Sequence, residues 1–371
     1  MRITIKVGSN VLSRSDGSLD VTRMSSLVDQ ISVLRSRGIE VLLVSSGAMA
    51  SGRSELRGMV TKKMDSVEER QLYSAVGQAK LINRYFDLFR EHGITVGQVL
   101  TMKENFSSRH LYLNQRHCMS VMLENGVIPI INENDTVSVT ELMFTDNDEL
   151  SGLVSTMMDC DALVILSNID GLYTGSPGNK GSELIRFVEP GRDLSQYIQS
   201  EKSGFGRGGM ITKSGIAQKV AQEGIPVFIA NGKRDKILES LLPTLEELQK
   251  GGAMENLVDS PTPFTLFLPS KGSVSSVKKW IAHSDGFTKG EIHLNKGACE
   301  KIMGEVAASV LPVGITKVVG DFDRHDIISI HDDNGKRIGV GRSEYGSEEL
   351  RGCAGQREKK AAVHYDFLYL E

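Results

Sequence analysis

In the first two thirds of the chain, apolar residues follow two alternating patterns. Short runs rich in β-branched residues, such as Ile3–Ser9 and Val41–Gly47, flank a longer stretch, Val21–Arg37, in which apolar residues recur at helical spacing. Further strand-like runs are Ile94–Leu100, Val127–Asn132, Ala162–Ser167 and Pro226–Ala230, and further helical patterns are Glu68–Glu91, Ser108–Glu124, Glu149–Met158, Lys213–Glu223 and Leu238–Lys250. Helices that alternate with strands are typical of βαβ units and parallel sheets. The pattern predicts an open α/β sandwich.

The pattern changes after the last of these helices. A stretch with Gly-Gly, scattered serines and the prolines Pro261, Pro263 and Pro269 indicates a linker. Beyond it the strands are short and the turns closely spaced, and Asn334-Gly335 predicts a hairpin, because such turns require positive φ angles. We predict a first domain over residues 1–256, a linker over 257–272 and a small β-rich domain over 273–371.

Composition narrows the class of protein. A chain of 371 residues favours two domains, and its 40% hydrophobic and 24% charged residues are typical of a globular protein. No stretch approaches the ~20 apolar residues of a membrane span, and the N-terminus reads as a strand rather than a signal peptide. The four cysteines form no CxxC pair, which argues against a zinc site and a disulfide framework and favours the reducing cytoplasm. The net charge of −4 argues against a general affinity for nucleic acids.

The segment Gly204–Gly215, with the sequence GFGRGGMITKSG, is the first candidate site. Its glycines precede a helical pattern, and free backbone amides at a helix N-terminus favour phosphate. The alternative is a flexible surface loop beside an ordinary helix.

Two strand ends carry further candidates, because ligands of open parallel sheets bind at the carboxyl ends of strands. The first strand places Lys6 near its end, followed by Gly8, and the second ends in Ser46 and Gly47. A lysine in an apolar strand is costly unless its ammonium group reaches an anion or emerges at the strand end. Serine and glycine there suit a carboxylate or a phosphate, and the alternative is a simple strand-to-helix turn.

Two polar clusters follow Ile131, in the segments NENDTVSV and FTDNDEL. Their short polar side chains are Asn132, Glu133, Asn134, Asp135, Asp146, Asn147 and Asp148. Turn-forming residues and a helix N-cap before Glu149 account for some of them. The rest suit the ammonium and carboxylate groups of a small amino acid. The segment LSNIDGLYTGSP, at another strand end, is either a connection or a contact for the base or ribose of a nucleotide.

Together these residues indicate phosphoryl transfer. Lys6 and Lys213 can neutralise a phosphoryl group from two sides, and an aspartate such as Asp148 can hold both lysines. No general base is needed if the acceptor is a carboxylate, which is already anionic. The chain contains no GxxxxGK[ST] and no protein-kinase motif set, so neither P-loop nor protein-kinase chemistry is indicated.

The motifs KVGSNVL, VSSGAMASG, SAVGQ, INENDTVSV, DNDELS, DGLYTGSP and GGMITK occur here in the order found in one family. Through them nearly the whole chain resembles the glutamate 5-kinase family of the amino-acid kinase superfamily, whose members make γ-glutamyl phosphate for proline synthesis. The resemblance implies an αβα sandwich with a largely parallel central sheet, and a PUA domain at the C-terminal end.

The resemblance also implies roles for the matching residues. Lys6 and Lys213 would be catalytic, with Asp148 organising them. The implied glutamate-binding residues are Ser46, Gly47, Asn132, Asp135 and Asn147. The implied ATP-binding residues are Lys6, Gly8, Ser167, Asn168, Arg207, Gly208, Gly209, Met210, Ile211, Thr212 and Lys213. Mg²⁺ would arrive mainly with ATP rather than in a protein cage, so no metal-ligating residue is assigned.

Departures from the family pattern affect two expectations. Asn168 stands where many members have aspartate and Arg207 where many have threonine, which leaves nucleotide preference open. Asn295 and His325 depart from the pattern in the C-terminal domain and put RNA binding by that domain in question.

The resemblance implies partners as well. They are L-glutamate as substrate, proline as feedback inhibitor, glutamyl-phosphate reductase as functional partner, and other copies of the chain in a dimer or tetramer. Two alternatives remain. The acceptor can be aspartate, acetylglutamate, carbamate or a nucleoside monophosphate. In a different class of function, the protein binds RNA through local lysines of the C-terminal domain, whose charge nearby aspartates offset.

Overall fold

The chain forms two compact units in a computed structural model, which describes residues 1–60, 63–138, 144, 146–177, 179, 181–194, 197, 210–251, 260–270, 288–304, 308–357 and 359–370. The first unit comprises Met1–Lys103 and Asn114–Ser273, and the second comprises Glu104–Leu113 and Val274–Glu371. Among the described residues, no helix combines the length and the apolar character needed to cross a membrane.

The first unit is built on an eight-stranded sheet with the order β3-β4-β2-β1-β5-β7-β8-β6. Its strands are β1 (Arg2–Val7), β2 (Glu40–Ser45), β3 (Val96–Thr101), β4 (Ile128–Glu133), β5 (Ala162–Ser167), β6 (Phe187–Val188), β7 (Val227–Asn231) and β8 (Phe264–Phe267). Neighbouring strands run parallel except β7 and β8, which are antiparallel. The predicted largely parallel sheet is therefore confirmed.

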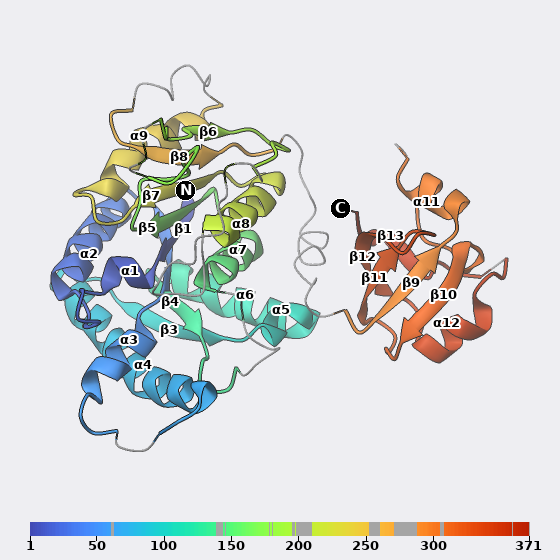
Figure 1. Ribbon diagram of the computed structural model, residues 1–371, viewed down its shortest axis with the longest axis horizontal. Helices are drawn as coiled ribbons and strands as arrows, with labels where there is room; N and C mark the ends of the chain where they lie inside the picture. Colours follow the sequence, from blue (N-terminus) through green and yellow to red (C-terminus); the bar gives the residue numbers. More distant parts are fainter. Residues whose placement is uncertain are drawn as a thin grey trace. The chain divides into compact units, whose positions relative to one another are not determined.

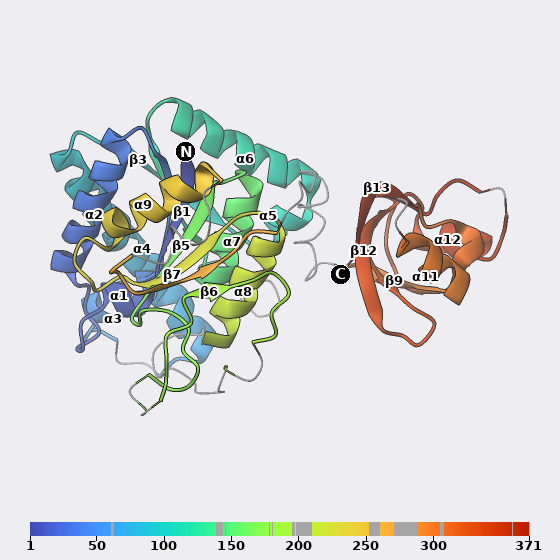
Figure 2. The same ribbon diagram turned by 90° about the horizontal axis from the view of Figure 1, so that it is seen from above.

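Helices cover both faces of this sheet (Figures 1 and 2). The helices of this unit are α1 (Ser9–Leu12), α2 (Val21–Ser36), α3 (Ala48–Glu55), α4 (Ser66–Glu91), α6 (Arg109–Glu124), α7 (Asn147–Met157), α8 (Met210–Gln222) and α9 (Ile237–Gln249), while α5 (Glu104–Ser107) and the first residues of α6 are grouped with the second unit. Val164 and Leu166 of β5 belong to the core that contains α2, α4 and α9. Leu163 and Ile165, with opposite parity, belong to the core that contains α8. Because side chains of a strand alternate between faces, this pattern confirms the three αβα layers.

Two strands of the sheet were not predicted. The sequence indicates a linker over residues 257–272, but the structure places β8 there, with Phe264–Phe267 fully buried against β7. Its pairing with Phe187–Val188 forms the edge of the sheet. Pro261 and Pro263 precede β8 and Pro269 follows it, and these flanking prolines conceal a strand of only four residues.

The second unit contains a five-stranded sheet with the order β10-β9-β11-β12-β13. Its elements are β9 (Gly290–Leu294), α11 (Lys296–Ile302), β10 (Ile315–Gly320), β11 (Ile327–His331), β12 (Arg337–Ser343), α12 (Ser347–Cys353) and β13 (Val363–Leu370). The predicted hairpin joins β11 to β12, and Gly335 has a φ of 81°. The β-rich character of this part of the chain is confirmed.

A close contact between α3 and α4 fixes the position of α4. An ideal Cβ on Gly77 of α4 would lie 1.8 Å from the carbonyl oxygen of Ala48, and one on Gly52 of α3 would lie 1.8 Å from that of Tyr73. Backbone atoms cannot move aside as a flexible side chain can, so only glycine fits at either position.

We expect Gly77→Ala to lower the free energy of unfolding by on the order of 3 kcal/mol, because the clash outweighs the ~1 kcal/mol that alanine gains in helix propensity. Urea denaturation measures the change. Gly215→Ala in α8 is the matched control, since within the described residues no atom outside the adjoining residues and the helix's own backbone lies within 4 Å of its Cβ position. It should stabilise the protein slightly, and equal effects of the two substitutions would contradict the steric argument.

Candidate functional site

The candidate site lies at the carboxyl ends of β1, β2, β4 and β5. The loops that follow these strands are tied to neighbouring strands: the Ser46 N–H donates to the Val7 carbonyl at 3.1 Å, and the Gly8 N–H donates to the Leu166 carbonyl at 3.2 Å. The polar residues that follow each strand are therefore held at one edge of the sheet, as the sequence predicts.

Two lysines share one carboxylate at this edge. The Nζ atom of Lys6 lies 2.6 Å from Oδ1 of Asp148, and the Nζ atom of Lys213 lies 2.7 Å from Oδ2. Lys6 differs in parity from Ile5, so it points toward the layer that contains α7, where Asp148 lies, and α8, where Lys213 lies. In the sequence, Lys213 lies 65 positions after Asp148, and Lys6 lies near the start of the chain. The structure brings the three residues together and places Asp148 between the two lysines.

The charges of this group are strongly coupled. The side chains of Lys6 and Asp148 are 5% and 1% exposed, and that of Lys213 is 13% exposed. Burial alone would raise the pKa of Asp148, but the ammonium groups of Lys6 and Lys213 outweigh it and lower the pKa to about 2. Two ammonium groups and one carboxylate leave one positive charge, which suits an anionic ligand.

Asp146 begins α7 as its N-cap. Its Oδ1 accepts hydrogen bonds from the backbone N–H groups of Asp148 at 2.9 Å and Glu149 at 3.1 Å, so the predicted N-cap before Glu149 is confirmed. Burial, and then the neighbouring charge of Asp148, raise the pKa of Asp146 to about 6. This cap fixes the first turn of α7 and therefore the direction of the two residues that follow it.

A chain of amide hydrogen bonds lies beside the lysine pair. Nδ2 of Asn147 donates to Oγ of Ser46 at 2.8 Å and to Oδ1 of Asn132 at 3.0 Å, and Nδ2 of Asn132 donates to Oε1 of Gln78 at 2.8 Å. Gly47 is the N-cap of α3 with a φ of 107°, a conformation that favours glycine. These hydrogen bonds join the end of β2, α4, β4 and α7.

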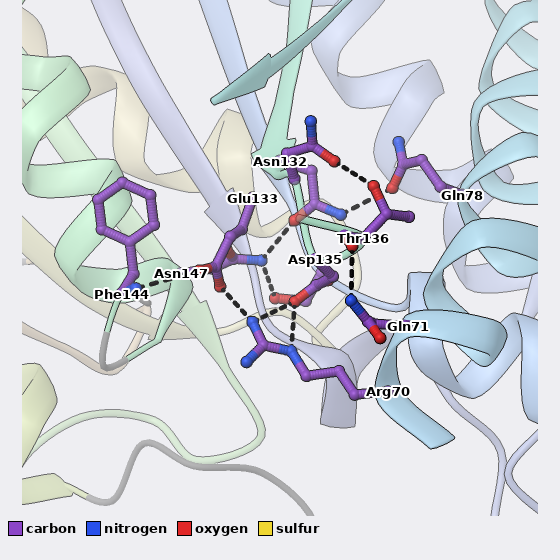
Figure 3. Close-up of polar contacts among 11 residues, drawn as sticks. Arg70, Gln71, Gln78, Asn132, Glu133, Asp135, Thr136, Phe144 and Asn147 are labelled. Carbon is purple, nitrogen blue, oxygen red and sulfur yellow. Dashed lines mark hydrogen bonds and ion pairs between the residues drawn. The ribbon is translucent and has the colours of Figure 1, made fainter. Parts of the chain in front are cut away.

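Asp135 belongs to a second cluster, which Figure 3 shows. Nε of Arg70 donates to Oδ1 of Asp135 at 2.8 Å, and Nη2 of Arg70 donates to Oε2 of Glu133 at 3.0 Å. The backbone N–H of Phe144 donates to the other oxygen of Glu133, Oε1, at 3.1 Å. A cavity of about 290 Å³ adjoins this cluster and is lined by residues of α4, β3 and the end of β4, Gln78 and Asp135 among them.

The predicted nucleotide residues are only partly described. Ser167 ends β5 and Asn168 follows it, with Oγ of Ser167 donating to Oδ1 of Asn168 at 3.4 Å. Met210 and Thr212 lie in the first turn of α8, as does the backbone of Ile211. The side chain of Ile211 and the residues Arg207, Gly208 and Gly209 lie outside the described part of the chain, as does most of the segment between Asp135 and Asp146.

Two functional candidates escaped the sequence analysis. Arg70 and Gln78 lie on α4, whose buried positions run Arg70, Ser74, Gly77, Leu81 and Tyr85. A charged residue on an otherwise buried helical stripe is the signal that could have identified Arg70, since an unpaired buried charge is costly. Gln78 ends the SAVGQ motif that contributes to the family resemblance, which is the signal that could have identified it.

The residues at the site fit a nucleotide phosphate better than a metal held by the protein. No group of three or more His, Cys, Asp or Glu side chains that could hold a metal occurs in the described ranges. A Cβ on Gly8 would lie 3.5 Å from Nζ of Lys6, so glycine there leaves the ammonium group open to a ligand. Since both oxygens of Asp148 pair with lysines, the carboxylate orients cations rather than binding a metal ion.

Comparisons with known proteins agree with this geometry. Residues 1–231 match the model of the Amino acid kinase family, and residues 290–365 match that of the PUA domain. The chain is 61% identical over 370 residues to a glutamate 5-kinase of Bacteroides thetaiotaomicron, covering 100% of this chain and 98% of the relative. It is 45% identical over 373 residues to a glutamate 5-kinase of Chlorobaculum tepidum, covering 100% and 97%.

Proposed function

The chain belongs to the amino acid kinase family and, within it, to the glutamate 5-kinases, and from this premise we propose how its residues carry out the reaction. The enzyme uses ATP to phosphorylate the γ-carboxylate of L-glutamate, which gives L-glutamyl 5-phosphate, the first step from glutamate toward proline. The observation that carries the assignment of roles is the pairing of Lys6 and Lys213 with a single buried carboxylate, Asp148.

Lys6 and Lys213 are proposed as the catalytic cations. A new bond forms between a γ-carboxylate oxygen of glutamate and phosphorus, while the bond between phosphorus and the β,γ-bridging oxygen of ATP breaks. Negative charge on the transferred group and the leaving phosphate is met by the two ammonium groups, which Asp148 holds at fixed positions before the reaction. No proton has to be removed, because the acceptor is an anion.

The amide chain is proposed as the glutamate site. Ser46, Gly47, Asn132 and Asn147 present hydroxyl and amide groups beside the lysines, and these suit the carboxylates of the substrate. Asp135 supplies the negative charge that an α-ammonium group requires. Asp135 is one of the residues that line the cavity of about 290 Å³ between α4, β3 and the end of β4.

The other strand ends are proposed to hold ATP. Gly8 follows β1, Ser167 ends β5 and Asn168 follows it, and these residues suit the phosphates, ribose or base of ATP. The first turn of α8, with Met210, Ile211, Thr212 and Lys213, directs backbone amides toward phosphate oxygens, and we propose that Arg207, Gly208 and Gly209 extend this contact. Mg²⁺ bound with ATP would neutralise part of the charge of the β and γ phosphates.

Regulation and assembly are proposals that rest on family membership. They are feedback inhibition by proline, a homo-oligomer, and glutamyl-phosphate reductase as the enzyme that consumes the unstable acyl phosphate. A cytoplasmic location is supported by the four free cysteines, three of which are buried.

An ADP-release assay with a panel of acceptors tests the function. The purified full-length chain is supplied with MgATP and with L-glutamate, L-aspartate, N-acetyl-L-glutamate or UMP, with and without proline. We expect ADP release with L-glutamate and trapping of the acyl phosphate by hydroxylamine. Release that is faster with another acceptor would contradict the proposed substrate, and release without any acceptor would indicate simple ATP hydrolysis.

A further inference from the structure

Arg70 belongs to the candidate site, although it lies far from Lys6 and Lys213 in the sequence. It lies in the second turn of α4, and the side chains of Arg70 and Glu133 are only 7% and 8% exposed. The side chain of Asp135 is more open, with 19% exposed. One positive and two negative charges leave one negative charge in the cluster, and the most accessible carboxylate in it is that of Asp135.

The hydrogen bonds of Arg70 are distributed unequally between the two carboxylates. Nε and Nη2 both donate to Oδ1 of Asp135, at 2.8 and 2.5 Å, and Nη2 also donates to Glu133. Glu133 uses its second oxygen for the backbone N–H of Phe144. Within the described part of the chain, Oδ2 of Asp135 receives no hydrogen bond, so it is the oxygen that stays open to a ligand.

This arrangement fixes the direction of Asp135. Two donors that converge on one oxygen restrict rotation of the carboxylate and leave the other oxygen as the acceptor. Asp135 lines the cavity together with Gln78, which binds Asn132 of the amide chain. Through Gln78, Asp135 is therefore linked to Asn132, one of the groups proposed to hold the carboxylates of the substrate.

From these contacts we propose that Arg70 is a positioning residue, which aims Oδ2 of Asp135 at the α-ammonium group of the amino-acid substrate. The proposal rests on the proposed function, because it takes the ligand of the cavity to be L-glutamate. Arg70 does not touch the substrate. Arg70 holds the carboxylate of Asp135 in one orientation. Removal of the Arg70 side chain should therefore weaken the binding of glutamate and leave the pairing of the two lysines with Asp148 unchanged.

Steady-state kinetics of Arg70→Met in the full-length chain test the proposal. We expect the KM for L-glutamate to rise tenfold or more, while kcat changes less than threefold and the KM for ATP less than twofold. Arg70→Lys should fall between the wild type and Arg70→Met, because a single ammonium group cannot reproduce the planar pattern of three N–H donors. Arg84→Met is the matched control, since Arg84 lies on the same helix but is exposed.

The double variant Arg70→Met/Glu133→Gln separates positioning from folding. It removes one charge of each sign, so the net charge of the cluster stays as in the wild type. Asp135 still lacks the two hydrogen bonds that Arg70 donates to it. A KM for glutamate that stays raised in the double variant supports the proposal. A KM that returns to the wild-type value, or that is unchanged in Arg70→Met, overturns it, and so does an equal loss in kcat and in ATP affinity.

The same experiment distinguishes this proposal from the assigned function. A wild-type protein that neither binds nor phosphorylates L-glutamate overturns both. A wild-type protein that phosphorylates L-glutamate, together with an Arg70→Met variant of unchanged KM, overturns the positioning role alone.

Discussion

Replacement of Asp148 by asparagine is expected to lower kcat/KM about a thousandfold, which corresponds to about 4 kcal/mol of transition-state stabilisation. The carboxylate lies between two ammonium groups at 2.6 and 2.7 Å and is almost completely buried. Without its charge, the two ammonium groups repel each other in a poorly hydrated site, where removal of one partner of an ion pair costs about 3–5 kcal/mol. At least one lysine then leaves its position or loses its proton, and the phosphoryl group loses that cation.

The low pKa of Asp148 adds a test by pH. A lowered pKa means that the stabilisation given by the ionised group is present above the ordinary aspartate pKa of about 3.9 and is lost as the pH falls toward 2. The carboxylate therefore stays ionised over the whole range in which enzymes are normally assayed. Because the pKa of Asp146 is about 6, the comparison is made above that value. Lowering the pH of the wild type from 8 to 7 should not reproduce the Asp148→Asn defect, and an activity loss of the same size over that interval would contradict the role given to this charge.

Asp159→Asn is the matched control for Asp148→Asn. Asp159 follows the same helix α7 and pairs with Arg116 at 2.8 Å, but both side chains are about one third or more exposed to solvent. Exposed ion pairs contribute little, about 0–1 kcal/mol, and asparagine tolerates the positive φ of 47° at this position. Activity should stay within a factor of two of the wild type.

The sequence predicts some residues of the site better than others, because sheet topology positions some of them and helix packing positions the rest. Lys6 and Ser46 follow from topology alone, because the carboxyl ends of parallel strands meet at one edge of the sheet. Asp148 and Lys213 lie in the first turns of helices, and their approach to Lys6 is expected from the charges of the three residues and from the family resemblance, not from topology. Which oxygen pairs with which lysine depends on helix packing and on the N-cap at Asp146, and only the structure supplies it.

Other features could not be predicted for identifiable physical reasons. The strand Phe264–Phe267 is too short for a periodic pattern, and its flanking prolines are typical of a linker. Arg70 lies more than sixty positions before the carboxylates that it binds, and its helical pattern does not show which strand it faces. Ion pairs such as those of Arg70 depend on the angle at which α4 crosses the sheet. The close contact between Gly52 of α3 and Gly77 of α4 helps to set that angle.

Replacement of Lys213 by alanine is expected to lower kcat a thousandfold or more while the chain stays folded. The side chain of Lys213 is 13% exposed, compared with 5% for that of Lys6, so Lys213 is the more accessible of the two lysines that Asp148 holds. A cation that meets charge developing on the transferred phosphoryl group acts mainly in the transition state, so its loss should lower kcat more than it raises either KM. Asp148 keeps Lys6 as a partner, which limits the loss of stability.

Steady-state kinetics with MgATP and L-glutamate measure this loss, and thermal denaturation checks the fold. Lys219→Ala makes the same substitution in the same helix, α8, away from the pairing with Asp148, and should leave kcat near the wild-type value. If Lys213→Ala retained the wild-type rate, the pairing of two lysines through Asp148 would be a structural ion pair. If the variant instead lost only its affinity for ATP, Lys213 would bind the nucleotide equally in the ground state and the transition state, and Lys6 would be left as the catalytic cation.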